Sequence, residues 1–109
     1  MHTAAYSQKL SIEIYNKTGI TLDSVQLDSV YIGRILNDSS AIVKDLNEFQ
    51  LTGSWPLLRI KAVDTSGKLL IRLAECGTKA VTVKEGHHAF DIKLNTAGLN
   101  PYLELLPHR

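Results

Sequence analysis

His87 and His88, next to Glu85, are the residues of this chain whose types best suit a metal site. Imidazole nitrogens and carboxylate oxygens are common zinc and transition-metal ligands. Adjacent residues on a β-strand point to opposite faces, so the two imidazoles cannot readily bind one ion. Alternation places His88 on the face of Phe90, near a strand end. We therefore interpret His88 as a structural or rim histidine and assign no metal and no cofactor.

Nucleophilic catalysis requires a serine, threonine or cysteine within hydrogen-bond reach of a base. The sequence contains no Gly-x-Ser-x-Gly motif, and its single Cys76 has no positively charged neighbour that would favour the thiolate. The glycines are scattered singly and predict no phosphate-binding loop. Glu13, Asp23 and Asp91 would have to converge to form a carboxylate pair. The sequence assigns no catalytic residue and favours a noncatalytic protein.

Residues 57–73 carry the clearest structural pattern, because apolar residues alternate with polar ones on both sides of a turn sequence. A loop formed by residues 64–67 would pair Ala62 with Leu69, Ile60 with Ile71 and Leu58 with Leu73. This register predicts a hairpin with all its apolar pairs on one buried side. It leaves Leu70 opposite Lys61 on the outer face.

The same register places Arg59 directly opposite Arg72 on the outer face, with Lys61 next along the strand. Like charges that face each other across strands are destabilising. We expect them to be offset by an acid from a neighbouring strand, such as Glu13 or Asp91, by a bound anion, or by a partner surface. Arg59, Lys61 and Arg72 are therefore candidate binding residues.

Trp55 is the fourth candidate binding residue, and it precedes Pro56 in a segment with the character of a loop. Tryptophan is favoured at interfaces because it combines a large apolar area with a polar N–H group. It also commonly closes the open end of a sandwich core. Both interpretations remain open at this point.

Period-two alternation recurs along the whole chain and predicts half-buried strands. Residues 10–14 alternate before a turn at 16–19, and a phase slip near Asp28-Ser29 suggests a bulge or bend. Residues 40–51 fit either a bent strand or a short helix, and we favour the strand. Further strands are expected at 81–83, at 88–94, and at 102–105 after Pro101.

This series predicts an all-β fold: a single antiparallel β-sandwich of about seven strands, immunoglobulin-like or prealbumin-like. An up-and-down barrel is the structural alternative. We expect one domain over residues 1–109, with a loose N-terminal tail at 1–7.

The segments Ile12–Gly19 and Leu22–Val25 carry a resemblance to a known type of domain. The chain resembles small immunoglobulin-like or prealbumin-like sandwiches of uncharacterised bacterial cell-envelope proteins, in which a first strand ends in an Asn–Thr–Gly turn. The resemblance implies this fold and an extracytoplasmic setting, and it carries over no catalytic residue. The Cys–Trp–Cys core of antibody domains is absent, since Cys76 is alone.

Composition excludes several classes of function. The 109 residues carry a net charge of +1, which does not provide the basic field that nonspecific nucleic-acid binding requires. No apolar run approaches the ~20 residues of a membrane span. The leading hypothesis is a noncatalytic interaction or structural module that binds a protein or glycan partner, with a possible homodimer through a sheet edge. The alternative is a small-ligand binder or enzyme with a site in the loops at one end of the sandwich.

Overall fold

The computed structural model describes residues 9–44, 46–72 and 79–108, and these segments are built from β-strands. Eleven strands and no helix occur in the described part of the chain, which confirms the all-β prediction. The strands are β1 (Ser11–Asn16), β2 (Leu22–Leu27), β3 (Val30–Ile35), β4 (Ser40–Val43), β5 (Phe49–Thr52), β6 (Trp55–Pro56), β7 (Ile60–Val63), β8 (Leu69–Arg72), β9 (Val81–Val83), β10 (His87–Asn95) and β11 (Tyr102–Pro107). The tail expected at residues 1–7 lies outside the described residues.

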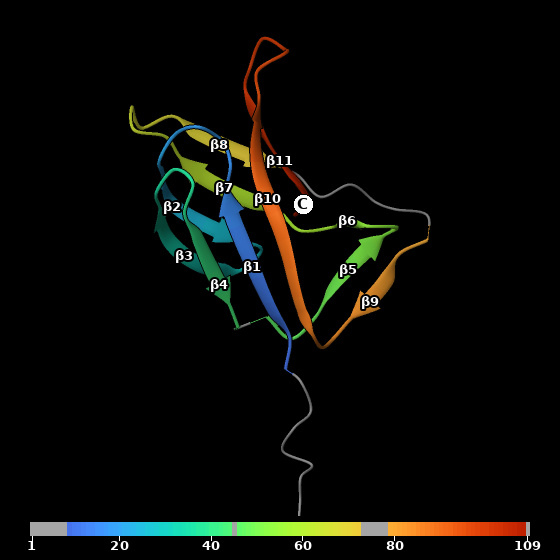
Figure 1. Cartoon of the computed structure of the whole chain (residues 1–109). Coiled ribbons are helices and arrows are strands. Elements are labelled where there is room, and N and C mark those ends of the chain that lie inside the picture. The colour runs from blue at the N-terminus through green and yellow to red at the C-terminus, as the bar shows by residue number, and fades with distance from the viewer. Residues whose placement is uncertain (1–8, 45, 73–78, 109) are drawn as a thin grey trace, which may run out of the picture.

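The strands form three sheets (Figure 1), with the orders β11-β10-β1-β4, β3-β2-β7-β8 and β6-β5-β9. The first two sheets share one core, and the small third sheet lies to one side of them. The prediction of a single, fully antiparallel sandwich of about seven strands is therefore wrong in its count and its pairing. Strand β1 pairs with β10 in parallel, and strands β5, β6 and β9 belong to a separate sheet.

Alternation of apolar and polar residues places one side of each main sheet in the core. Strand β1 buries Ile12 and Ile14 completely, and β7 buries Ile60 and Ala62. A buried isoleucine side chain contributes about 1.5–3 kcal/mol when it leaves water. The buried hydrophobic residues are Leu10, Ile12, Ile14, Leu22, Val25, Leu27, Ile35, Val43, Phe49, Leu58, Ile60, Ala62, Leu70, Phe90, Ile92, Leu103 and Leu105.

Asn16 ends β1 and is completely buried. Its Nδ2 donates to the carbonyl oxygens of Ile20, at 2.8 Å, and Ile35, at 2.9 Å. Its Oδ1 accepts from the backbone N–H of Thr18, at 3.1 Å, and from the Thr18 hydroxyl, at 2.6 Å. The predicted turn is confirmed, and Gly19 takes a φ of 89° there. Burial of this amide is possible because its donors and its acceptor are all used.

The phase slip at Asp28-Ser29 is a two-residue turn and not a bulge or bend within one strand. It joins β2 and β3 in a hairpin whose first pair is Leu27 and Val30. Asp28 has a φ of 50°, in the left-handed region that Asp tolerates better than most residues. The irregularity in β2 lies earlier, around Ser24, which has a φ of 51°.

The predicted hairpin at residues 57–73 exists as β7 and β8, but its register differs by one residue. The connection contains residues 64–68, so Ala62 pairs with Leu70 and Ile60 with Arg72. Asp64 Oδ1 accepts three bonds, from the Ser66 N–H, the Ser66 hydroxyl and the Lys68 N–H, which holds the longer loop. A one-residue shift moves every side chain of a strand to the other face, so Leu70 is buried. Leu73 lies outside the described residues.

The ambiguous segment at residues 40–51 contains no helix in its described part, but it forms two strands of different sheets, β4 and β5, and not the single bent strand that we favour from the sequence. Residues 81–83, 87–95 and 102–107 are strands, in agreement with the alternation read from the sequence. His88 shares the core side of β10 with Phe90, and its ring packs edge-on against Phe49 with ring centroids 5.3 Å apart.

Candidate functional site

The outer face of the sheet β3-β2-β7-β8 presents apolar side chains to solvent around one lysine. The strand register places Tyr31, Gln26, Lys61 and Ile71 in a single row across the four strands. Tyr31 is 67 % exposed and Ile71 37 % exposed. In the next row, Leu69 is 58 % exposed. We call these five residues the Lys61 face.

The sequence of strand β8 explains why apolar side chains lie on this face. Its segment Leu69-Leu70-Ile71 contains three consecutive apolar residues, so alternation leaves at least one of them outside the core in either register. In the observed register Leu70 is buried, and Leu69 and Ile71 lie on the outer face. Clustered exposed apolar residues bordered by polar ones are typical of interaction surfaces. The Lys61 face therefore combines apolar contact area with a central positive charge.

The acidic residues on this side of the molecule are engaged within the chain. Asp23 accepts a 2.6 Å bond from Arg34 Nε, and the Asp64 carboxylate holds the hairpin loop. The bond from the Ser66 hydroxyl is the main cause that lowers the pKa of Asp64. Among the described residues, neither Lys61 nor Arg59 forms an ion pair.

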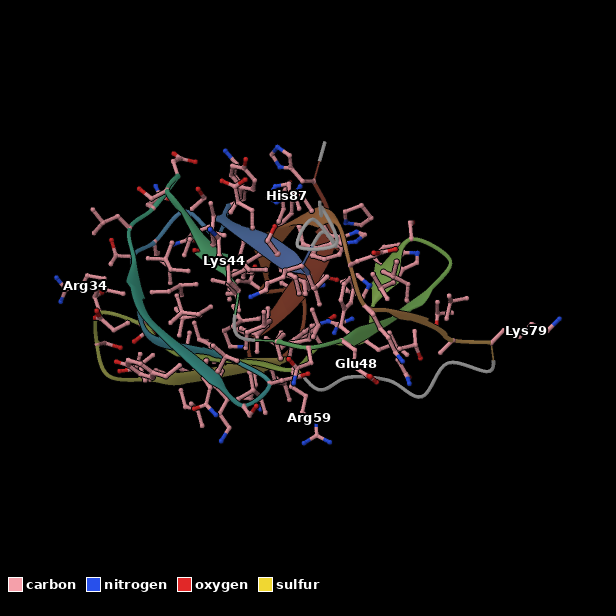
Figure 2. All side chains as sticks on the ribbon, turned by 90° about the horizontal axis from the view of Figure 1, so that it is seen from below. Arg34, Lys44, Glu48, Arg59, Lys79 and His87 are labelled. Atoms are coloured by element: carbon pink, nitrogen blue, oxygen red, sulfur yellow. The ribbon has the colours of Figure 1, made fainter. Side chains whose placement is uncertain are left out.

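Arg59 lies at the end of the Lys61 face, beside a shallow depression. Its N–H donates to Asp28 Oδ1 at 2.8 Å, and its carbonyl accepts from the Asp28 N–H at 2.9 Å. The depression is lined by Gln26, Asp28, Ser29, Leu57 and Arg59. Figure 2 shows the Arg59 side chain extending away from the ribbon, on the opposite side of the molecule from His87. Gln26 belongs to both the depression and the Lys61 face, so the two are continuous.

Arg72 does not lie opposite Arg59, which corrects the predicted facing of two arginines. It pairs with Ile60 on the side of β8 that carries Leu70, and its Nη1 donates to the carbonyl of Leu58. The proposed acids Glu13 and Asp91 lie on the other main sheet and cannot offset a charge on this one. Arg59 and Lys61 thus share an outer face, and Arg72 does not join them.

Trp55 belongs to β6 in the third sheet and is 51 % exposed. It is not the core plug that one interpretation of the sequence favoured. Phe49, which precedes it, takes that role, because it is buried and contacts Phe90 with ring centroids 5.8 Å apart. The structure therefore separates Trp55 from the sheet that carries Arg59 and Lys61.

The outer face of the other main sheet carries a hydrogen-bonded group around His87. Its Nδ1 lies 2.7 Å from Ser11 Oγ, and its Nε2 lies 3.4 Å from Glu13 Oε1. Ser40 Oγ donates to Glu13 Oε2 at 2.9 Å, and this bond is the main cause that lowers the Glu13 pKa. The residue types resemble a hydrolytic triad, but the Ser11 N–H, a donor that an oxyanion hole would need, donates to the Gly86 carbonyl.

A second histidine, His108, lies on the same face, directly after the end of β11. Its Nδ1 lies 2.6 Å from Asp91 Oδ1, and its ring stacks on Tyr15 with centroids 3.9 Å apart. Asp91 is buried to 8 % exposure beneath this contact. Loss of solvent raises the Tyr15 pKa, and a hydrogen bond to Glu13 adds to the effect. This cluster attaches the C-terminal strand to the central strand β1.

Potential metal ligands are scattered in the part of the chain that the structure describes. No group of three or more potential ligands gathers there. The rings of His87 and His88 contact different groups, since His88 Nε2 lies 3.1 Å from the Glu85 carbonyl oxygen. Cys76 lies outside the described residues.

Sequence reasoning missed Tyr31, Gln26, Asp28 and Ser29 as parts of a candidate surface. The signal was the Asp28-Ser29 dipeptide between two alternating runs, which marks a two-residue hairpin turn. With β2 and β3 read as a hairpin, Tyr31 falls opposite Gln26 on the outer face.

The described part of the chain has no helix of the length and apolar character needed to cross a membrane.

Comparisons with known proteins show the fold alone. No protein-family model matches the chain, and no curated protein matches it. Among solved structures, the chain is similar to one described as "NMR structure of the protein from Eubacterium rectale". The two share 9 % sequence identity with a TM-score of 0.62, and the match covers 100 % of this chain and 96 % of the other. The arrangement of strands is therefore one that the Eubacterium rectale protein also adopts.

Proposed function

We propose that this protein is a noncatalytic interaction module that binds a protein partner through the Lys61 face. The observation that carries the proposal is the exposure of Tyr31, Leu69 and Ile71 around Lys61 on one sheet. Tyrosine is enriched at interfaces, because it buries a large area and loses little rotamer freedom. A protein partner fits this surface better than a glycan, since three of its five side chains offer mainly apolar contact.

The partner that we propose is a different protein and not a second copy of this chain on the same face. A two-fold symmetric contact would bring the central Lys61 of each copy close together, and like charges at an interface oppose association. A homodimer would use another region. The terminal strand β9 of the third sheet, with Val81 exposed, is the sheet edge that we propose for such pairing.

The family resemblance described from the sequence is also part of this proposal. We place the protein among the immunoglobulin-like or prealbumin-like domains of bacterial cell-envelope proteins, in an extracytoplasmic setting. The support is the Asn16–Gly19 turn after the first strand and the all-β fold.

Site-specific photocrosslinking tests the proposal. A photoreactive phenylalanine replaces Tyr31 in one variant and Ile42 in another, because both side chains are more than half exposed but lie on different sheets. We expect the Tyr31 variant to form a discrete adduct in extracts of the source organism. The adduct should disappear when Lys61→Glu is added, and the Ile42 variant should not form it. Equal adducts from both positions, or an adduct insensitive to Lys61→Glu, would reject the Lys61 face.

A second candidate function, hydrolysis of a small ester, rests on one observation, the Ser11–His87–Glu13 group. A serine-directed fluorophosphonate probe followed by peptide mass spectrometry tests it. Labelling of Ser11 that His87→Ala abolishes would support an enzyme, whereas an unmodified Ser11 would remove this candidate.

A further inference from the structure

We infer that the depression beside Arg59 is a subsite that accepts a carboxylate side chain of the protein partner. This inference rests on the proposed function, since it names the chemistry that the Lys61 face would recognise at one of its ends. Three of the five lining residues carry hydrogen-bond donors: the Arg59 guanidinium, the Gln26 amide and the Ser29 hydroxyl. A planar guanidinium binds a carboxylate through two parallel N–H···O bonds.

The backbone at the depression is held in place, whereas the Arg59 side chain is left available. Asp28 and Arg59 exchange two hydrogen bonds, and Gln26 Nε2 donates to the Asp28 carbonyl at 3.1 Å. No ion pair within the described residues uses the Arg59 guanidinium. By contrast, the nearest comparable arginine on this sheet, Arg34, is already bound to Asp23. Arg59 is thus the arginine of this sheet's outer surface that can receive a carboxylate from outside.

Asp28 also determines what kind of anion fits. Asp28 is one of the residues that line the depression, and one of its carboxylate oxygens accepts the Arg59 N–H. A nearby negative charge repels any anionic ligand, and the repulsion grows with the charge of the ligand. A singly charged, planar carboxylate is therefore favoured over a doubly charged phosphate. The residue Leu57 adds an apolar wall that suits the methylene groups of a glutamate or aspartate side chain.

A substitution of Asp28 tests whether its negative charge weakens the binding of a carboxylate. Asn in place of Asp28 keeps the side-chain oxygen that accepts the Arg59 N–H and tolerates the positive φ of 50°. Asp28→Asn thus removes the repulsive charge without disturbing the turn. We expect it to bind a carboxylate more tightly than the unmodified protein.

The test is an NMR titration of the full chain, labelled with ¹⁵N, with N-acetylglutamate N-methylamide as the probe. N-acetylglutamine N-methylamide is the matched neutral control at the same ionic strength. We expect saturable chemical-shift changes at the Arg59 Nε–H and at the Gln26 and Ser29 amides. These changes should be at least threefold larger with the glutamate probe than with the glutamine control. Asp28→Asn should lower the dissociation constant at least twofold, and Arg59→Gln should abolish the shifts. Inorganic phosphate, added separately, should shift these signals less.

A charge-matched variant controls for the loss of net positive charge. Lys79 is exposed and projects at a different end of the molecule from Arg59 (Figure 2), so Lys79→Gln should leave the titration unchanged. Equal shifts with both probes, an Arg34 response as large as that of Arg59, or weaker binding by Asp28→Asn would overturn the subsite. If the crosslink at Tyr31 still forms, these results would reject the subsite but not the proposal that the Lys61 face binds a protein. Loss of that crosslink, with the carboxylate titration intact, would reject the face and not the subsite.

Discussion

Asp28 forms hydrogen bonds with both backbone polar groups of Arg59, its N–H and its carbonyl. The Asp28 N–H donates to the Arg59 carbonyl at 2.9 Å, and Asp28 Oδ1 accepts the Arg59 N–H at 2.8 Å. The turn between β2 and β3 is thereby joined to the segment that leads into β7. This contact places the guanidinium of Arg59 at the end of the Lys61 face, so the side chain of a turn residue determines where a candidate binding group lies.

Asp28→Ala should destabilise the protein, because alanine removes the acceptor for the Arg59 N–H and adopts a positive φ at a cost. We expect the free energy of unfolding to fall by about 1–2 kcal/mol. Urea unfolding followed by fluorescence of the single Trp55 measures it. Asp28→Asn is the control and should change stability by less than about 0.5 kcal/mol. An equal loss in both variants would show that the charge, and not the hydrogen bond, stabilises the turn.

The two arginines of the β7–β8 region should differ in their effects on stability. Arg72 is half-buried and donates to the Leu58 carbonyl, so Arg72→Ala should cost about 1–2 kcal/mol in the free energy of unfolding. Arg59→Ala removes an exposed side chain and should cost less than about 0.5 kcal/mol. Chemical denaturation of both variants at the same pH makes the comparison. A larger loss for Arg59→Ala would contradict the observed register.

Asn16 should be among the residues least tolerant of substitution. Asn16→Ala leaves the carbonyls of Ile20 and Ile35 without their side-chain donor in a buried site. We expect a loss of about 3 kcal/mol in the free energy of unfolding. Asn37→Ala, in an exposed turn, is the matched control and should be nearly neutral. A near-neutral Asn16→Ala would mean that water replaces the amide.

Stability at acid pH should depend on Glu13. Its folded pKa lies below the usual value of 4.5, mainly because the Ser40 hydroxyl donates to the carboxylate. A lowered pKa means that the unfolded chain binds the proton more tightly. The contribution is therefore fully present above pH 4.5 and is lost as the pH falls through the folded pKa.

Two variants test this pH dependence. Ser40→Ala should raise the Glu13 pKa toward its usual value, as followed by NMR of the Glu13 side chain. Glu13→Gln should make the free energy of unfolding fall less steeply between pH 5 and about pH 3. An unchanged Glu13 pKa in Ser40→Ala, together with an unchanged slope in Glu13→Gln, would show that the Ser40 bond does not persist in solution.

The sequence predicts the strands well because alternation is a local property, but pairing depends on contacts that alternation does not specify. The run Leu69-Leu70-Ile71 is apolar in either register, so pattern alone could not decide whether Leu70 or its neighbours enter the core. Three hydrogen bonds to Asp64 favour the longer loop and decide the register. The parallel pairing of β1 with β10 joins residues 76 positions apart, and no local signal indicates it.

The candidate site could be predicted only in part for the same reason. Arg59 and Lys61 are identified from the sequence, because they alternate with buried Ile60 and need no knowledge of the partner strand. The face on which Arg72 lies follows from the register of the hairpin, so the sequence alone does not predict it. Tyr31 and Gln26 reach the same surface only through the β2–β3 hairpin, and a phase slip in the sequence does not distinguish its two-residue turn from a bulge.

The affinity of the purified partner for variants of the Lys61 face tests the central claim most directly. Isothermal titration calorimetry would compare Lys61→Glu and Ile71→Asp with Ile42→Asp, an exposed apolar position on the other main sheet. The proposed interface predicts that Lys61→Glu and Ile71→Asp each weaken binding at least tenfold, which corresponds to about 1.4 kcal/mol. Ile42→Asp should leave the affinity unchanged. Equal affinity of all three variants, with folds verified by NMR, would contradict the claim that this face binds the partner.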